Sequence, residues 1–240
     1  MKILSIGNSF SHNAQTYLYQ LAYADRFSMK TANLYIGGCS LETHYNNMKS
    51  GAKANPFYLN GNESGFTVSI EEALKSDSWD FVTLQQASHF SAKRDTYYPY
   101  INELADYVRS LCPTAKLCIH QTWGYADGSE RLASQGFDSM KAMSEKIFEC
   151  YDEAAKAVNA DVIIRSGEAM LSLNERWNAP VHADTFHAAA GLPIYMLAQV
   201  WFRTLVGRAP HDLYEAVSFK DITREEAALA ADIAHKVTGI

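Results

Sequence analysis

Residues 1–13 read MKILSIGNSFSHN, an apolar run that ends abruptly in a small polar block. Met1 to Ile6 has the short apolar pattern of a buried parallel strand, and Gly7 and Asn8 end that pattern. In open α/β sheets, ligands and catalytic groups lie beyond the carboxyl ends of the strands. Ser9, directly after this strand, is therefore the first candidate functional residue.

Strand-like apolar runs alternate with helical patterns along the rest of the chain. We expect parallel strands in five segments, at residues 2–7, 29–37, 80–86, 116–122 and 161–167. Helical spacing of apolar residues occurs at 14–27, 97–111, 140–158, 188–207 and 221–237. The alternation predicts a three-layer α/β/α sandwich around a five-stranded parallel sheet. No linker-like segment divides the chain, so we expect a single domain over residues 1–240.

Two local features refine this outline. Residues 57–68, FYLNGNESGFTV, contain an Asn-Gly pair between two β-prone runs, which predicts a small hairpin. Whether this hairpin covers the cleft as a lid is left open. Asp221 or Thr223 is expected to cap the last helix.

Composition excludes several classes of function. The 240 residues carry a net charge of -6 with no cluster of Lys or Arg, which argues against binding of nucleic acid. The chain lacks an apolar run of membrane-spanning length and a leader pattern, so we expect no membrane partner and a cytoplasmic location. A removed signal peptide would leave the same sequence. The four cysteines show no metal-ligand spacing, so we expect neither metal nor cofactor. The oligomeric state is left open.

Four polar loops follow predicted strands or precede a helix, and parallel strands would bring them to one edge of the sheet. They are residues 7–11, 37–40, 85–89 and 181–187, the last of which is expected after the fifth strand. Together they supply a serine, a glycine pair, amides and an Asp/His pair. These are the parts of an acyl-transfer site.

Each part has a chemical role in such a site. Ser9 needs a base to accept its proton, and His187 is the candidate, with Asp184 orienting the imidazole. The negative charge that develops on the substrate oxygen needs fixed donors. The candidates are the backbone N–H of Ser9, the N–H of Gly38 and the side-chain amide of Gln85.

The order of these blocks resembles that of the SGNH/GDSL hydrolase superfamily. GNSFS after the first strand and DTFH near the carboxyl terminus match its serine and Asp-x-x-His blocks. The resemblance implies a flavodoxin-like α/β/α fold with Ser9, Asp184 and His187 as the triad and Gly38 as an oxyanion glycine. More narrowly, the chain resembles an uncharacterised, mainly bacterial branch with Gly-Asn-Ser-Phe, Gly-Gly-Cys-x-Leu and Leu-Gln-x-x-Ser-His blocks.

Two positions depart from the superfamily pattern. Asn8 stands where the first block usually has Asp, and LQQASH replaces the Gly-x-Asn-Asp of the third block. Carbohydrate acetylesterase branches have Gln-Gly-Glu-Ser there, and this alignment selects Gln85 over Gln86 as the oxyanion donor. Gln86, His89 and Trp123 are candidates for binding substrate, since aromatic side chains around a cleft suit sugars or acyl groups.

These observations predict a serine esterase that removes a small acyl group, with acetyl on a carbohydrate as one candidate. Two alternatives remain from other classes. One is a catalytically degenerate module on the same fold that binds a glycan or a small molecule. The other is a flavodoxin-like binding protein in which Ser9 and His187 lie far apart.

Overall fold

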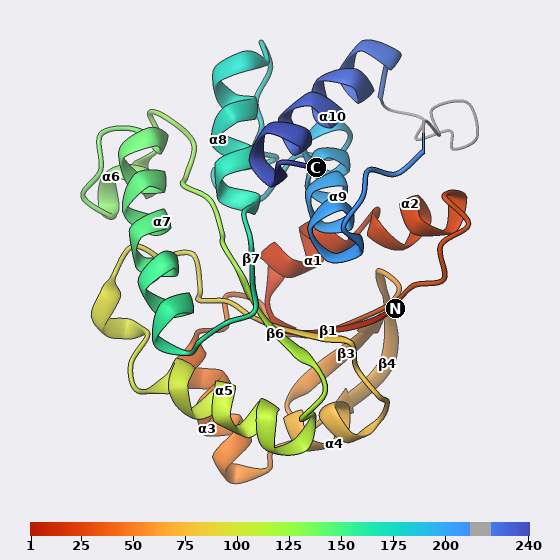
Figure 1. The fold of residues 1–240 in the computed structure, drawn as a ribbon. Coiled ribbons are helices and arrows are strands. Elements are labelled where there is room, and N and C mark those ends of the chain that lie inside the picture. Colours follow the sequence, from red (N-terminus) through yellow and green to blue (C-terminus); the bar gives the residue numbers. More distant parts are fainter. Residues whose placement is uncertain (212–221) are drawn as a thin grey trace.

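The computed structural model describes residues 1–211 and 222–240, and its strands form one seven-stranded sheet between two layers of helices (Figure 1). The strand order is β4-β3-β2-β1-β5-β6-β7. The strands are β1 (Lys2–Gly7), β2 (Lys30–Tyr35), β3 (Asn55–Leu59), β4 (Asn62–Val68), β5 (Phe81–Leu84), β6 (Lys116–His120) and β7 (Val162–Ile164). The three-layer α/β/α architecture predicted from the sequence is confirmed.

The five predicted parallel strands form the centre and one side of the sheet. β1 pairs in parallel with β2 on one side and with β5 on the other, and β6 and β7 continue the parallel order. Gly7 is in register with Tyr35, and Ile6 with Leu84, so the carboxyl ends of β1, β2 and β5 lie side by side. The loops that follow them therefore start at the same edge of the sheet.

The sheet has seven strands, two more than the prediction, because the hairpin joins it. β3 pairs antiparallel with β2, and β4 pairs antiparallel with β3. Asn60 and Gly61 both have positive φ, 49° and 83°, which suits a tight two-residue hairpin turn. The hairpin thus extends the edge of the sheet beside β2.

The helices cover both faces of the sheet. They are α1 (Ser9–Gln15), α2 (Leu18–Ala24), α3 (Leu41–Ser50), α4 (Ile70–Lys75), α5 (Tyr100–Leu111), α6 (Glu130–Ser134), α7 (Met140–Ala157), α8 (Ser166–Arg176), α9 (Leu192–Val206) and α10 (Arg224–Thr238), with a short 3-10 turn η1 (Arg94–Thr96). In the described part of the chain, no helix has the length and apolar character needed to cross a membrane.

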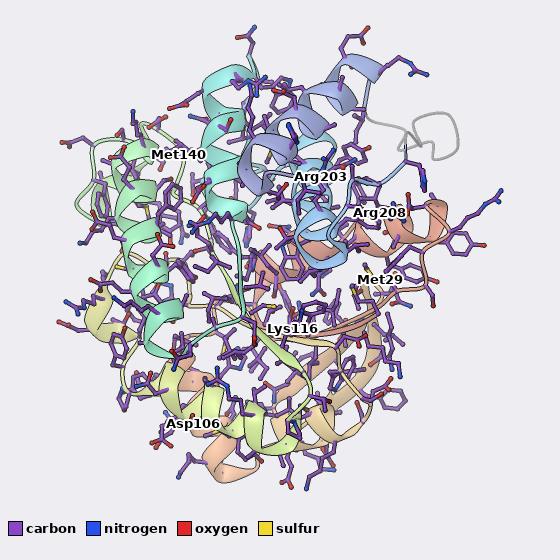
Figure 2. All side chains as sticks on the ribbon, viewed as in Figure 1. Met29, Asp106, Lys116, Met140, Arg203 and Arg208 are labelled. Atoms are coloured by element: carbon purple, nitrogen blue, oxygen red, sulfur yellow. The ribbon has the colours of Figure 1, made fainter. Side chains whose placement is uncertain are left out.

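Alternate residues of β1 supply two separate cores. Leu4 and Ile6 are fully buried against α3, α4, α5 and α7, whereas Ile3 is fully buried on the face covered by α1, α2, α8, α9 and α10. Side chains fill the space between the helices and the sheet on both faces (Figure 2). Both faces of β1 are therefore packed against helices, and this packing fixes the position of Asn8 and Ser9, which follow the strand.

Two differences from the prediction bear on the polar loops. α1 begins at Ser9, directly after the strand, rather than at residue 14. The fifth strand ends at Ile164, and α8 lies between it and the loop at residues 181–187, which therefore does not follow a strand directly. At the last helix, one of the two predicted caps is confirmed, because Thr223 forms a capping box with Glu226; the other, Asp221, lies outside the described residues.

Candidate active site

Ser9, His187 and Asp184 form a continuous chain of hydrogen bonds. The Oγ of Ser9 lies 2.9 Å from Nε2 of His187, and Nδ1 of His187 lies 2.8 Å from Oδ2 of Asp184. The loop that carries Asp184 and His187 thus reaches the start of α1 across 178 positions of sequence. These three predicted residues are brought together as a nucleophile, a base and an orienting carboxylate would be.

The Asp184 carboxylate is held in its charged form. Burial raises its pKa, but the backbone N–H groups of Phe186 and His187 and the His187 ring outweigh this and lower it to about 2. Those two N–H groups donate to Oδ1 at 2.7 and 2.8 Å, so Oδ2 is left for the ring. An ionised Asp184 accepts from Nδ1–H of His187, and Nε2 is then the nitrogen free to accept the Ser9 proton.

Asn8 fixes the start of α1 and ties it to the glycine loop. Its Oδ1 accepts from the N–H of Phe10 at 3.0 Å, which makes it the N-cap of α1. Its Nδ2 donates to the carbonyl oxygen of Cys39 at 3.1 Å. A carboxylate has no such donor, so the amide at this position links the serine block to the loop that contains Gly38.

Gln85 lies behind the site rather than in it. Its side chain is buried, with Nε2 donating to Oδ1 of Asn8 at 2.6 Å and Oε1 2.7 Å from Nδ1 of His120. Nε2 of His120 lies 3.0 Å from Oγ of Ser166, which also accepts from the Trp201 indole. The sequence predicts Gln85 as an oxyanion donor, but its amide is engaged with Asn8 and His120.

Burial keeps His120 neutral, and its hydrogen-bond partners set its tautomer. His120 is fully buried, and this burial lowers its pKa to about 3. Because Gln85 presents its oxygen, Nδ1 of His120 carries the proton and Nε2 accepts from the Ser166 hydroxyl. Every member of this network has a partner, so the network holds Asn8 rigidly.

Gln86 and Trp123, two candidates for binding substrate, are both buried. Nε2 of Gln86 donates to the carbonyl oxygen of Thr96. Oε1 of Gln86 accepts from the backbone N–H groups of Leu41 and Ala87. The Trp123 indole donates to the carbonyl oxygen of Phe186. Both side chains support the walls of the site from inside the protein.

A cavity of about 280 Å³ lies over Ser9. Its lining brings together all four predicted loops and adds Tyr35 and Arg131 from elsewhere: Asn8, Ser9, Phe10, Tyr35, Gly37, Gly38, Ser88, His89, Arg131, Phe186 and His187. His89, the third candidate for binding substrate, is among them. Gly38 has a φ of 64°, a backbone conformation that favours glycine.

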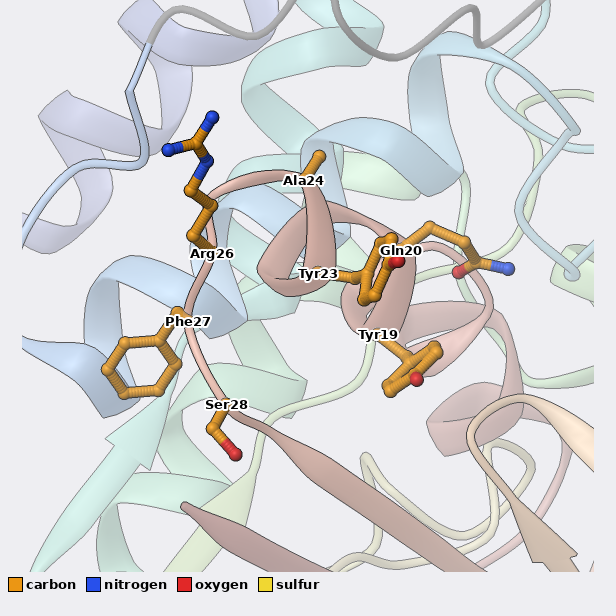
Figure 3. Close-up of a pocket in the computed structure, with 7 residues that line it drawn as sticks. All are labelled: Tyr19, Gln20, Tyr23, Ala24, Arg26, Phe27 and Ser28. Carbon is orange, nitrogen blue, oxygen red and sulfur yellow. The ribbon is translucent and has the colours of Figure 1, made fainter.

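A larger cavity, of about 790 Å³, lies elsewhere, along α2 and the segment that follows it (Figure 3). The described residues that line it are Tyr19, Gln20, Tyr23, Ala24, Arg26, Phe27 and Ser28. None of these belongs to the polar loops, and no serine among them is paired with a base. Chemistry therefore favours the smaller cavity.

Several residues of the site were not assigned from the sequence. His120 and Ser88 lie at or just beyond the ends of predicted strands, where functional groups are expected in an open α/β sheet, so their positions carry a sequence signal. Arg131 gave no signal, because it comes from a short helix remote from the motifs. In residues 1–211 and 222–240, no group of three or more His, Cys, Asp or Glu side chains is placed to hold a metal ion.

Comparison with known proteins gives a family and a fold. A family model described as a domain of unknown function, DUF4886, matches residues 2–237. No significant match was found among curated proteins. A crystal structure of a DUF4886 family protein from Bacteroides uniformis has a TM-score of 0.86 and 29% identity, covering 99% of this chain and 94% of that one.

More distant solved structures share the architecture. A putative GDSL-like lipase from Parabacteroides merdae has a TM-score of 0.59 and 10% identity, covering 86% of this chain and 96% of that one. A family 3 carbohydrate esterase from Clostridium thermocellum has a TM-score of 0.53 and 13% identity, with coverage of 86% and 96%. The SGNH-like fold with an uncharacterised branch, inferred from the sequence blocks, is confirmed.

Proposed function

The chain belongs to the DUF4886 family, a domain of unknown function, and we propose that it is an SGNH-type serine esterase that removes a small acyl group. The observation that carries the proposal is the hydrogen-bonded chain from Ser9 Oγ through His187 to Asp184, with donor-acceptor distances of 2.9 and 2.8 Å. A binding module has no need for a histidine base hydrogen-bonded to the half-buried Ser9. The small cavity and the esterase relatives support the same reaction class.

The first half-reaction acylates the serine. His187 Nε2 takes the proton of the Ser9 hydroxyl while Oγ attacks the ester carbonyl carbon. Asp184 stays ionised and stabilises the imidazolium that forms. The carbonyl π electrons move to oxygen, and the backbone N–H groups of Ser9 and Gly38 are the proposed donors to that oxyanion.

Departure of the alcohol completes the acylation, and the second half-reaction then releases the acid. The tetrahedral intermediate collapses, the bond to the alcohol oxygen breaks, and His187 gives its proton to the departing alcohol. Water then attacks the acyl-Ser9 carbonyl with His187 as base, and Ser9 leaves with the returned proton. Gln85 acts in this proposal through Asn8, as a positioning residue.

The size of the cavity supports a small acyl group. A volume of about 280 Å³ is at or below the lower end of the range of about 300–1,000 Å³ for small-molecule sites. An acetyl group joined to a sugar-sized alcohol fits this limit better than a long-chain lipid ester. Tyr35 lines the cavity, and its ring packs together with those of Tyr58 and His12, with centroids 5.0 to 5.6 Å apart; this aromatic cluster would suit packing against a sugar ring.

The experiment is hydrolysis of p-nitrophenyl acetate and butyrate by the wild type, Ser9→Ala and His187→Ala. We expect activity in the wild type, loss of at least about 10³-fold in each variant, and a preference for acetate. Ser110→Ala is the control, because it removes an exposed serine hydroxyl that donates to the carbonyl oxygen of Tyr107 and does not line the cavity. Wild-type activity that survives in Ser9→Ala would overturn the assignment of the nucleophile.

A further inference from the structure

The cavity wall contains an arginine and no carboxylate, although the protein as a whole is acidic. The chain has a net charge of -6, yet the described residues that line the cavity include Arg131 and two histidines and no carboxylate. The burial and nearby charges that lower the pKa of His89 keep that ring neutral, so Arg131 supplies the positive charge of this wall. It raises the local concentration of an anionic ligand at this site.

Arg131 is held in place by aromatic rings. Its guanidinium lies 4.1 Å from the centroid of the Phe186 ring and 5.7 Å from that of Tyr125. The Tyr125 hydroxyl, in turn, is 2.9 Å from Oγ of Ser88. Burial raises the pKa of Tyr125, and hydrogen bonds of its hydroxyl with Ser88 and Arg131 oppose that rise. The guanidinium is thus oriented before any ligand arrives.

Most of the hydrogen-bonding capacity of Arg131 remains available. A guanidinium carries five N–H donors, and stacking on a ring uses none of them. No carboxylate within the described residues forms an ion pair with Arg131, whereas Arg94, which is exposed like Arg131, pairs with Glu153 at 2.8 Å. A planar fork of donors without an acidic partner suits a carboxylate.

A second cation strengthens the same field. Lys93 lies over the ring of Phe90, 5.4 Å from its centroid, and the Phe90 ring is 4.2 Å from that of His89. The pKa of His89 is lowered first by burial and then by the charges of Lys93 and Arg131. Both cations therefore act on a residue that lines the cavity.

The position of Arg131 indicates which half of an ester it would contact. The departing alcohol takes its proton from His187, so the alcohol half must pass close to that ring. Phe186 lies beside His187, with ring centroids 3.9 Å apart, and Arg131 covers Phe186. The acyl carbonyl is directed instead toward the N–H groups of Ser9 and Gly38.

We propose that Arg131 binds a carboxylate on the alcohol half of the substrate, so that the preferred substrates are O-acylated hydroxy acids. This inference rests on the esterase function proposed above and adds the charge of the substrate to it. Arg131 is then a specificity-determining residue. The Phe186 ring packs against the Arg131 guanidinium and the His187 ring, and the Phe186 backbone N–H donates to Asp184.

The test compares two acetate esters that differ in charge, 4-acetoxybenzoate and 4-acetoxybenzamide. For each enzyme the ratio of kcat/KM for the anionic ester to that for the neutral ester is measured, so that differences in leaving-group reactivity cancel between enzymes. We expect Arg131→Gln to lower this ratio about 10- to 100-fold, as loss of a charge-assisted hydrogen-bonded pair does. Arg131→Lys should give an intermediate value, because the charge remains and the fork is lost. Arg94→Gln replaces an exposed arginine that does not line the cavity, so it is the control and should leave the ratio unchanged.

The salt dependence gives a second readout. The wild-type ratio should fall as NaCl is raised from 0.05 to about 0.5 M, because screening weakens charge attraction, and the ratio of Arg131→Gln should change little. Hydrolysis of the neutral ester that is lost in Ser9→Ala, together with an anionic ratio that Arg131→Gln does not change, would overturn the role of Arg131 and leave the esterase intact. Absence of hydrolysis of both esters would instead count against the proposed function.

Discussion

The replacement Asn8→Asp tests how the serine block is tied to the glycine loop. Both hydrogen bonds accepted by Oδ1 of Asn8, from Phe10 and Gln85, can persist with a carboxylate. The bond donated by Nδ2 to the Cys39 carbonyl cannot, and two acceptors would face each other at about 3.1 Å. Asn8 is 1% exposed, so the unpaired acceptors have no water to bind.

The expected cost is about 2–4 kcal/mol of unfolding free energy at pH 7, since an unsatisfied buried acceptor costs about 1–3 kcal/mol and a charge adds to it. Burial should also raise the pKa of the introduced carboxyl above its unfolded value. Its protonated form can donate to Cys39, so the deficit is largest above that raised pKa and shrinks as the pH falls toward about 3.9. Esterase activity should fall about tenfold or more, because the loop that carries Gly38 loses its tie to Ser9.

Urea unfolding of the wild type and of Asn8→Asp between pH 5 and 8 measures the deficit. Asn46→Asp adds the same charge at an exposed position of α3 and is the matched control. A variant as stable as the wild type at pH 7, or a deficit that grows on acidification, would refute the account of Asn8.

Two further predictions concern the partners of the site. Asp184→Asn should lower kcat for p-nitrophenyl acetate by about 10³- to 10⁴-fold with little change in stability, because His187 would lose the partner that fixes its tautomer; a loss of less than tenfold would contradict this. His120→Gln should reduce acid sensitivity: the unfolded chain protonates this histidine below about pH 6.5, whereas the pKa of about 3 keeps it neutral when folded, so wild-type stability falls as the pH drops below 6.5. The variant should be spared about 2 kcal/mol of the loss between pH 7 and 5, measured by urea unfolding, and an unchanged slope would contradict it; His44, with a pKa of about 4, leaves part of the acid loss in place.

The parallel strands were predictable because strands buried on both faces read as continuous apolar runs. Residues 2–7 are such a run, and the pattern of apolar residues is enough to predict the strand. Helix α1 was not predictable in the same way, since Ser-Phe-Ser-His-Asn has modest helix propensity. Its first turn exists because Asn8 caps it and because Phe10 is buried against Trp123, at 4.3 Å between ring centroids.

The residues of the site likewise fall into two groups: those predictable from local sequence motifs and those positioned by contacts between distant parts of the chain. Ser9, Asp184 and His187 stand in local blocks whose chemistry is readable from residue types and spacing. The direction of the Gln85 side chain depends on His120, which is 35 positions away, and on Asn8, which is 77 positions away. Arg131 reaches the cavity only through the packing of α6 against Phe186, and no sequence pattern specifies that contact.

The most direct test of the central claim is covalent labelling with a fluorophosphonate, followed by peptide mass spectrometry. A serine activated by a base reacts at phosphorus and displaces fluoride, whereas an ordinary serine does not. We predict one adduct, on the peptide that contains Ser9, and its loss in both Ser9→Ala and His187→Ala. An unlabelled wild-type protein, or an adduct that forms equally well in His187→Ala, would contradict the claim that Ser9 and His187 form a nucleophile-base pair.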